Sequence, residues 1–207
     1  MKIYRYTTGP IMANSYIAAD DNKIGFLVDP GDADDAIRQK IDDEGIDLQY
    51  IILTHGHSDH IGGVPWFLER YPNVKTVASS LERNMLANPR MNSSIEFYGA
   101  PITVDADIWV NDGDELNVGD MHLKFFSTPG HSPGGICIYV EHYLFSGDTI
   151  FRGSVGRTDF EGGDFATLIK SIRDKIFVLP DDTKILPGHM DTTTVEFEKE
   201  NNPFVRA

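Results

Sequence analysis

The feature that most constrains the fold is the segment His55–His60, which reads His-Gly-His-Ser-Asp-His and follows the apolar run Tyr50–Leu53 after a single residue, Thr54. With seven histidines and 22 aspartates among 207 residues, chance produces an HxHxDH pattern in on the order of one such chain in a thousand. The apolar run predicts a short strand that is buried on both faces. Histidines two positions apart in extended chain point to the same side, so His55 and His57 can bind one ion at the end of an interior strand.

The rest of the chain alternates short strand-type runs with amphipathic helical stretches, which predicts an α/β fold. The expected strands cover residues 1–6, 15–19, 24–28, 50–53, 74–78, 107–110, 115–118, 122–126, 135–140, 143–145 and 184–186. The expected helices cover residues 33–44, 64–70, 80–86 and 164–175. The capping-box spelling Thr193-x-x-Glu196 predicts the start of a short final helix. Residues 88–103 lack periodicity, which predicts a long loop that can act as a lid beside a site.

Three further candidate ligands lie just past the ends of expected strands, in loops rich in Gly or Pro. His131 stands in Pro-Gly-His-Ser-Pro, Asp148 in Ser-Gly-Asp-Thr and His189 in Leu-Pro-Gly-His. Sites in sheet proteins are commonly built at this rim, and a neighbouring Gly lets the backbone approach closely. We therefore expect these side chains to converge on the His-rich segment.

The residue types fit a centre for two divalent metal ions. Neutral imidazole binds zinc, iron and manganese, with zinc preferred here, and two ions some 3.5–4 Å apart activate a trapped water molecule and clamp the oxygen under attack. We expect Asp148 to bridge the ions, and Asp59 to be a terminal ligand and a proton acceptor, so both are candidate catalytic residues. The expected metal ligands are His55, His57, Asp59, His60, His131, Asp148 and His189.

The order and spacing of these residues resemble the metallo-β-lactamase superfamily, of which the early turn Val28–Gly31 is also typical. The stretch Gly147–Phe160 is similar to the signature of glyoxalase II (hydroxyacylglutathione hydrolase) and its small bacterial relatives, as is the ending Asn202–Phe204. The resemblance implies an αβ/βα sandwich, two mixed β-sheets flanked by helices, with the metals at one edge. It also implies one ion on His55, His57 and His131, a second on Asp59, His60 and His189, and Asp148 between them.

The chain departs from full-length glyoxalase II after His189. Only 18 residues follow, so we expect the C-terminal helical domain that helps to hold glutathione in that enzyme to be absent. Residues 1–207 are then expected to form a single metallo-β-lactamase-like domain. The resemblance implies hydrolysis of a small anionic thioester such as S-lactoylglutathione.

Two other functions stay open. Gly156–Phe160 is equally similar to persulfide dioxygenases, which use a single iron at the positions matching His55, His131 and Asp148. A metal-retaining binding or regulatory module without turnover is the third interpretation. The native metal and the acyl group and thiol of the substrate are not specified by this pattern.

Two arginines in the glyoxalase-like stretch are candidate substrate-binding residues. Arg152 and Arg157 can each bind a substrate carboxylate through two charge-assisted hydrogen bonds. The alternative for Arg157 is a structural ion pair, for which Asp159 is the nearest acidic residue in sequence. The single cysteine, Cys137, lies in an apolar strand and is expected to be a buried hydrophobic residue.

The composition excludes some classes of partner and indicates the cellular compartment. Eighteen Lys and Arg against 32 Asp and Glu give a net charge of −14, which disfavours nucleic acid as a partner because its phosphates are held by clustered basic residues. No apolar run approaches the roughly 18 residues that a membrane span requires, and Thr7, Thr8 and Asn14 interrupt any signal-peptide core. We therefore expect a cytoplasmic protein that binds neither nucleic acid nor membrane, and its oligomeric state is left open.

Overall fold

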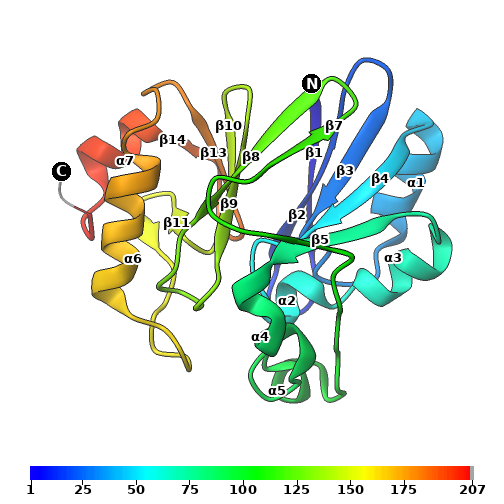
Figure 1. Ribbon diagram of the computed structural model, residues 1–207, viewed down its shortest axis with the longest axis horizontal. Coiled ribbons are helices and arrows are strands. Elements are labelled where there is room, and N and C mark those ends of the chain that lie inside the picture. Colours follow the sequence, from blue (N-terminus) through cyan, green and yellow to red (C-terminus); the bar gives the residue numbers. More distant parts are fainter. Residues whose placement is uncertain (206–207) are drawn as a thin grey trace.

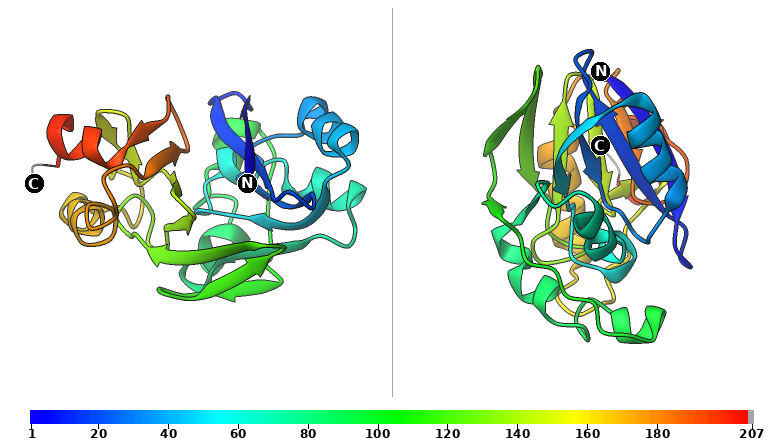
Figure 2. Two further views of the ribbon diagram at one scale, coloured as in Figure 1. Left: turned by 90° about the horizontal axis from the view of Figure 1, so that it is seen from above. Right: turned by 90° about the vertical axis from the view of Figure 1, so that its right-hand side faces the viewer.

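The computed structural model describes residues 1–205, which form four layers: helices, a β-sheet, a second β-sheet and helices (Figure 1). Helices α1 (Asp35–Glu44) and α3 (Val64–Arg70) cover the outer face of the first sheet. Helices α6 (Phe165–Ser171) and α7 (Val195–Asn201) cover the outer face of the second. The view from above shows the same order of layers (Figure 2). The expected sandwich of two mixed sheets flanked by helices is confirmed.

The first sheet has six strands in the order β1-β2-β3-β4-β5-β6. Its strands are β1 (Lys2–Thr8), β2 (Ala13–Ala19), β3 (Ile24–Val28), β4 (Asp47–Ile52), β5 (Lys75–Ser79) and β6 (Ile108–Val110). Neighbours are antiparallel from β1 to β3 and parallel from β3 to β6. Because β3 and β4 run in one direction, the residues that follow them emerge at the same edge of the sheet.

The second sheet has the order β14-β13-β10-β9-β8-β7. Its strands are β7 (Glu115–Val118), β8 (Met121–Ser127), β9 (Ile136–Val140), β10 (Tyr143–Gly147), β13 (Lys184–Pro187) and β14 (Thr193–Thr194). Strand β9 is antiparallel to both β8 and β10, and β13 is parallel to β10. Strands β8, β10 and β13 therefore run in one direction and their carboxyl ends meet at one edge.

Short elements connect these strands. They are α2 (Ser58–Ile61), the 3₁₀ turn η1 (Ser80–Glu82), α4 (Arg83–Ala87), α5 (Ser94–Tyr98), the β11 (Ile150–Phe151) and β12 (Ser154–Val155) hairpin, and the π-helical turn η2 (Ile172–Ile176). Helices α2, α4 and α5 lie together at the lower edge of the molecule in Figure 1. No helix within residues 1–205 has the length and apolar character needed to cross a bilayer.

Helix α1 illustrates how the local sequence determines an element. The Asp34 side chain accepts hydrogen bonds from the backbone N–H groups of Ala36 and Ile37 and so caps the helix. Ile37 and Ile41, four positions apart, are buried against the first sheet, and Gly45 ends the helix in the left-handed conformation.

The apolar core consists of three clusters, one between each pair of adjacent layers of helices or strands. One lies between the first sheet and α1 and α3, and includes Ile37 and Phe67. The central one lies between the two sheets, where Tyr16 and Phe26 each pack edge-on against Phe145. The third lies between the second sheet and α6 and α7, and contains Cys137, which is fully buried as expected.

The structure corrects three local expectations. Residues 88–103 are not a structureless loop, because they contain α5, which begins at Ser94. The β11–β12 hairpin was not expected. The final helix is capped by Thr194, whose hydroxyl accepts from the backbone N–H of Phe197, whereas Thr193 lies in β14 and donates its hydroxyl to Glu198. The capping-box assignment is therefore wrong by one residue.

Candidate metal centre

All seven expected ligands lie at one edge of the sandwich. His55 and His57 follow β4, and α2 carries Asp59 and His60 one turn later. The other three ligands follow β8, β10 and β13, whose carboxyl ends meet at this edge. They are His131, Asp148 and His189. The shared direction of the strands therefore explains why residues far apart in the sequence converge.

Three histidines form the first cluster. His57 Nδ1 lies 2.9 Å from His131 Nε2, which lies 3.3 Å from His55 Nε2, so three ring nitrogens face a common point. Burial, together with the neighbouring histidines, holds the pKa of His55 well below its usual range and lowers that of His57 to about 3. Neutral imidazole is the form that binds a metal.

The second cluster combines a carboxylate with two histidines. Asp59 Oδ2 lies 3.2 Å from His189 Nε2 and 3.6 Å from His60 Nε2. Burial alone would raise the pKa of Asp59, but the two histidines outweigh it and lower that pKa. Burial likewise opposes protonation of His60, but Asp59 and Asp148 raise its pKa to about 10.

Asp148 lies between the two clusters. Its Oδ2 is 3.6 Å from Nε2 of His131 in the first cluster and 3.6 Å from Nε2 of His189 in the second. Its Oδ1 is 3.4 Å from His60 Nε2. A side chain at Gly188 would fill this space, because a Cβ there would lie 2.3 Å from Asp148 Oδ1.

The donor set fits two divalent ions. His60 Nε2 and Asp148 Oδ1 are buried and have no hydrogen-bond partner within residues 1–205, and such orphaned polar atoms need an explanation. An ion in each cluster, with Asp148 shared, would give both atoms a partner. Nitrogen and carboxylate ligands without thiolate suit zinc, iron and manganese.

Hydrogen bonds on the far side of the rings orient the ligands. His60 Nδ1 donates to Asp29 Oδ2 at 2.9 Å, and His131 Nδ1 donates to the carbonyl oxygen of Arg157 at 2.7 Å. The Nδ1 of His55 lies 3.1 Å from the Thr54 hydroxyl. Each contact leaves Nε2 of that ring free to face an ion, which is the usual arrangement at metal-binding histidines.

Asp29 was not among the expected site residues. It also accepts from the Thr54 backbone N–H at 2.8 Å and from the Thr54 hydroxyl at 2.6 Å. Asp29, His55 and His60 are close enough to form a third possible metal cluster, but these bonds already occupy both carboxylate oxygens of Asp29. We therefore assign Asp29 to orienting His60. The signal in the sequence was its position in an Asp-Pro-Gly turn directly after β3.

Glu82 is a second residue that sequence reasoning missed. Its two carboxylate oxygens accept, each at 2.7 Å, from the backbone N–H of Gly56 and of Gly134. Gly56 stands between His55 and His57, so this buried carboxylate ties their loop to the loop that follows His131. Burial raises the pKa of Glu82, although the two N–H donors oppose that rise. In the sequence it resembles any charged residue on a helical surface.

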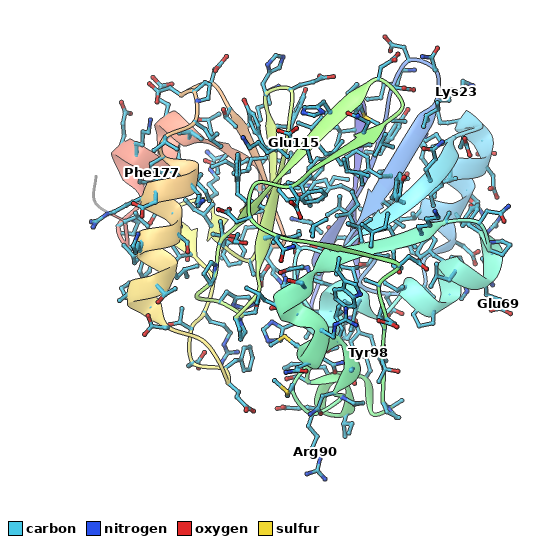
Figure 3. The ribbon with its side chains drawn as sticks, in the orientation of Figure 1. Lys23, Glu69, Arg90, Tyr98, Glu115 and Phe177 are labelled. Carbon is cyan, nitrogen blue, oxygen red and sulfur yellow. The ribbon has the colours of Figure 1, made fainter. Side chains whose placement is uncertain are left out.

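A cavity of about 400 Å³ opens over the clusters. Ligand side chains form its floor, and its walls are largely apolar, with Phe97, Phe151, Val155, Phe160 and Met190 among them. The expected lid segment contributes Phe97 to this wall. The hydroxyl of Tyr98, in the same helix (Figure 3), donates to the carbonyl oxygen of Gly31 at 2.7 Å.

The two candidate substrate-binding arginines lie in different environments. Arg157 lines the cavity, and its guanidinium lies over Phe160 and forms two hydrogen bonds of 2.7 and 2.8 Å with Asp159. The ion pair considered as an alternative is therefore present. Arg152 does not line this cavity, and its guanidinium lies over the ring of Phe197 in α7.

Comparison with known relatives agrees with this geometry. A probable metallo-hydrolase, YqgX of Bacillus subtilis, is 38% identical over 99% of this chain and 98% of its own length. The hydroxyacylglutathione hydrolase GloC of Haemophilus influenzae is 35% identical over 94% of this chain and 93% of its own.

Solved structures with this architecture include the B3 metallo-β-lactamase BLEG-1, with a TM-score of 0.93, 36% identity and full coverage of both chains. TTHA1623 in a di-iron-bound form has a TM-score of 0.86 and 30% identity, over 98% of this chain and 100% of its own. ETHE1 from Myxococcus xanthus has a TM-score of 0.82 and 27% identity, over 98% of this chain and 84% of its own. The family model of the metallo-β-lactamase superfamily matches residues 8–189, from β1 to the last ligand. The chain therefore belongs to the metallo-β-lactamase superfamily.

Proposed function

We propose that this chain is a metal-dependent thioester hydrolase with a dinuclear centre. The observation that carries the proposal is Asp148, whose oxygens lie 3.4–3.6 Å from histidine nitrogens of both clusters. Two divalent ions bound there, with zinc as the preferred metal, would lower the pKa of a water molecule toward neutrality and polarise the carbonyl of the substrate.

The chain's own residues divide the work of binding and proton transfer. His55, His57 and His131 would hold one ion, and Asp59, His60 and His189 the other. Asp59 lines the cavity beside the second cluster, so its carboxylate is placed to accept a proton as the substrate is attacked. The apolar walls exclude bulk water from the reacting carbonyl.

The substrate we propose is a small anionic thioester such as S-lactoylglutathione. Support comes from the relative that is named a hydroxyacylglutathione hydrolase and is 35% identical over nearly the whole chain. The apolar wall can pack against the acyl group or the thiol arm. Arg157 is the cation in the cavity wall and can bind a substrate carboxylate if Asp159 gives up one of its two bonds.

The test combines metal analysis with a thioester assay. We expect about two ions per chain in the purified protein. When the protein is added to S-lactoylglutathione, the ultraviolet absorbance of the thioester should fall. The Asp148→Ala variant should be inactive, whereas a variant of a remote exposed residue, Glu69→Gln, should keep full activity. Two ions per chain without cleavage of this or any other thioester would overturn the proposal.

The same measurements separate the alternatives. One iron per chain and oxygen consumption with glutathione persulfide would indicate a persulfide dioxygenase. Tight metal binding without turnover of thioesters or persulfides would indicate a binding or regulatory module.

A further inference from the structure

A second cavity, of about 480 Å³, lies on the other side of the wall that bounds the metal centre. The wall consists of the β11–β12 hairpin and the loop after β13. Phe151 and Met190 face the metal cavity, whereas the residues next to them, Arg152 and Asp191, line the second one. The volume is within the range of small-molecule sites, about 300–1,000 Å³. We call this second cavity the Arg152 groove.

Three cations line the Arg152 groove: Arg5 from β1, Lys184 from β13, and Arg152 itself. Within residues 1–205 neither Arg152 nor Lys184 has an acidic partner, and each lies over an aromatic ring instead, Phe197 and Tyr143 respectively. Such an accumulation of positive charge is notable in a chain with a net charge of −14.

One acidic residue lines the groove. Asp191 lies 3.4 Å from the guanidinium of Arg5, with 76% of its side chain exposed. Ion pairs this exposed are weak, so a ligand anion can replace Asp191 as the partner of Arg5. The lining side chains carry three positive charges against one negative charge.

The floor of the groove is apolar and aromatic. Ile3, Tyr16, Tyr143 and Leu186 form it. The hydroxyl of Tyr16 is already used, because it donates to the carbonyl oxygen of Pro187 at 2.7 Å. The ring of Tyr16 is itself buried in the central core, so it closes the floor without a free polar group, and a ligand must satisfy the cations with its own oxygens.

We propose that the Arg152 groove binds a small organic anion, with a carboxylate or phosphate group held by Arg152, Arg5 and Lys184 and an apolar body lying on the aromatic floor. Guanidinium groups bind such planar or tetrahedral oxyanions through paired hydrogen bonds. This site is separate from the thioester site, and the proposal does not depend on which reaction the metal centre catalyses.

The test is a titration of the zinc-loaded protein with benzenesulfonate, followed by amide chemical shifts in ¹⁵N spectra. A sulfonate is a poor zinc ligand, so it discriminates against the metal centre. We expect saturable shifts at Ile3, Arg5, Tyr143 and Lys184. The isosteric neutral compound methyl phenyl sulfone, which lacks the charge, should bind at least about tenfold more weakly.

Matched variants distinguish specific binding in the Arg152 groove from general attraction between the anion and positive charges on the protein. The double variant Arg152→Ala/Lys184→Ala should weaken benzenesulfonate binding at least about tenfold. The control is Arg83→Ala/Lys124→Ala, which removes the same charges from two cations that also lie over aromatic rings, Trp109 and Phe126, outside the groove. It should leave the affinity within about twofold.

Three results would overturn the proposal. They are shifts that stay linear up to the highest concentration, shifts confined to residues around the metal cavity, and equal losses of affinity in the two double variants. Without ligand, the ¹⁵N spectrum of each double variant should match that of the unsubstituted protein away from the substituted residues. This match establishes that both variants are folded, so a loss of binding is attributable to the removed cations.

Discussion

At the scale of single residues, the position of Asp148 between the clusters makes it unlike the other six ligands. Its two oxygens lie 3.4–3.6 Å from histidines of both clusters. We expect Asp148→Ala to lose metal at both positions, so that the metal content after dialysis falls from about two ions per chain to below one. Elemental analysis of the purified variant measures this. Full metal content in the variant would contradict the bridging role.

Asp59 provides the matched comparison, because it contacts only the second cluster. In Asp59→Ala the three histidines of the first cluster are intact, so about one ion per chain should remain. The variant should stay folded and lose turnover by a factor on the order of 10²–10⁴, since it lacks both a ligand and a proton acceptor. If Asp59→Ala lost both ions, as expected for Asp148→Ala, Asp59 would not be a ligand of the second ion alone.

Glu82 gives a prediction for a residue that contacts no ion. Glu82→Gln keeps the shape of the side chain but presents an NH₂ group to one of the two backbone N–H donors, at Gly56 or Gly134. The loops that carry the first cluster then separate, and we expect zinc affinity there to fall about 10–100-fold. Competition with a chromogenic chelator measures the affinity, and Glu69→Gln, whose side chain is 81% exposed, is the control. Equal affinities in the two variants would refute the positioning role.

These residues also show what the sequence could specify at this scale. The convergence of the seven candidate ligands was predictable because His and Asp at strand ends carry their chemistry in their type and spacing. Glu82 was not, because its role depends on two N–H groups that are 78 residues apart in sequence and adjacent only in the fold. Asp29 is intermediate: its Asp-Pro-Gly turn is visible, but its contact with His60 is tertiary.

At the scale of elements, the long strands and helices were predictable, since periodic burial appears directly in the sequence. The β11–β12 hairpin was not, because its strands of two residues are too short to show a period of two. Its formation depends on tertiary contacts instead, since Glu198 of α7 accepts from the backbone N–H of Gly153 at the turn. The one-residue error at Thr194 has a similar cause, because β14 pairing with β13 holds Thr193 in the sheet.

Helix α2 yields a prediction about close packing of elements. Gly62, which ends α2, has a backbone conformation that any residue adopts, with φ −58° and ψ −32°. A Cβ there would lie 2.3 Å from the carbonyl oxygen of Gly31. Gly62→Ala would ordinarily stabilise a helix, but here the clash must push α2 away from the turn after β3. We expect the free energy of unfolding to fall by about 1–3 kcal/mol, measured by urea denaturation.

Gly99 supplies the comparison for Gly62. It has φ +68°, and no atom would lie within 4 Å of a Cβ added there, so Gly99→Ala costs only the left-handed conformation, about 1–2 kcal/mol. The two variants should also differ in metal affinity. Gly62→Ala should lower it, since α2 carries Asp59 and His60, whereas Gly99→Ala should not, since α5 carries no candidate ligand. A Gly62→Ala protein with an unchanged unfolding midpoint and metal affinity would contradict the packing argument.

At the scale of the whole molecule, the candidate metal centre lies where the two sheets meet. His55, His57, Asp59 and His60 follow a strand of the first sheet, whereas His131, Asp148 and His189 follow strands of the second. Direct hydrogen bonds also cross this edge, such as the one from Asn14 in β2 to the carbonyl oxygen of Pro187 in β13. Ions bound at the centre would therefore stabilise the contact between the halves as well as supply chemistry.

This arrangement predicts a large effect of chelation on thermal stability. An ion present at about a thousand times its dissociation constant stabilises the folded state by about 4 kcal/mol, and in a domain of this size each kcal/mol corresponds to about 2–4 °C in Tm. Removal of the metals with a chelator should therefore lower Tm by at least about 8 °C, and zinc added back in excess should restore it. The Asp148→Ala variant, which binds little metal, should have a low Tm that the chelator hardly changes. If the chelator strips the metals from the unsubstituted protein and Tm stays the same, the ions do not hold the two sheets together, and the centre serves chemistry alone.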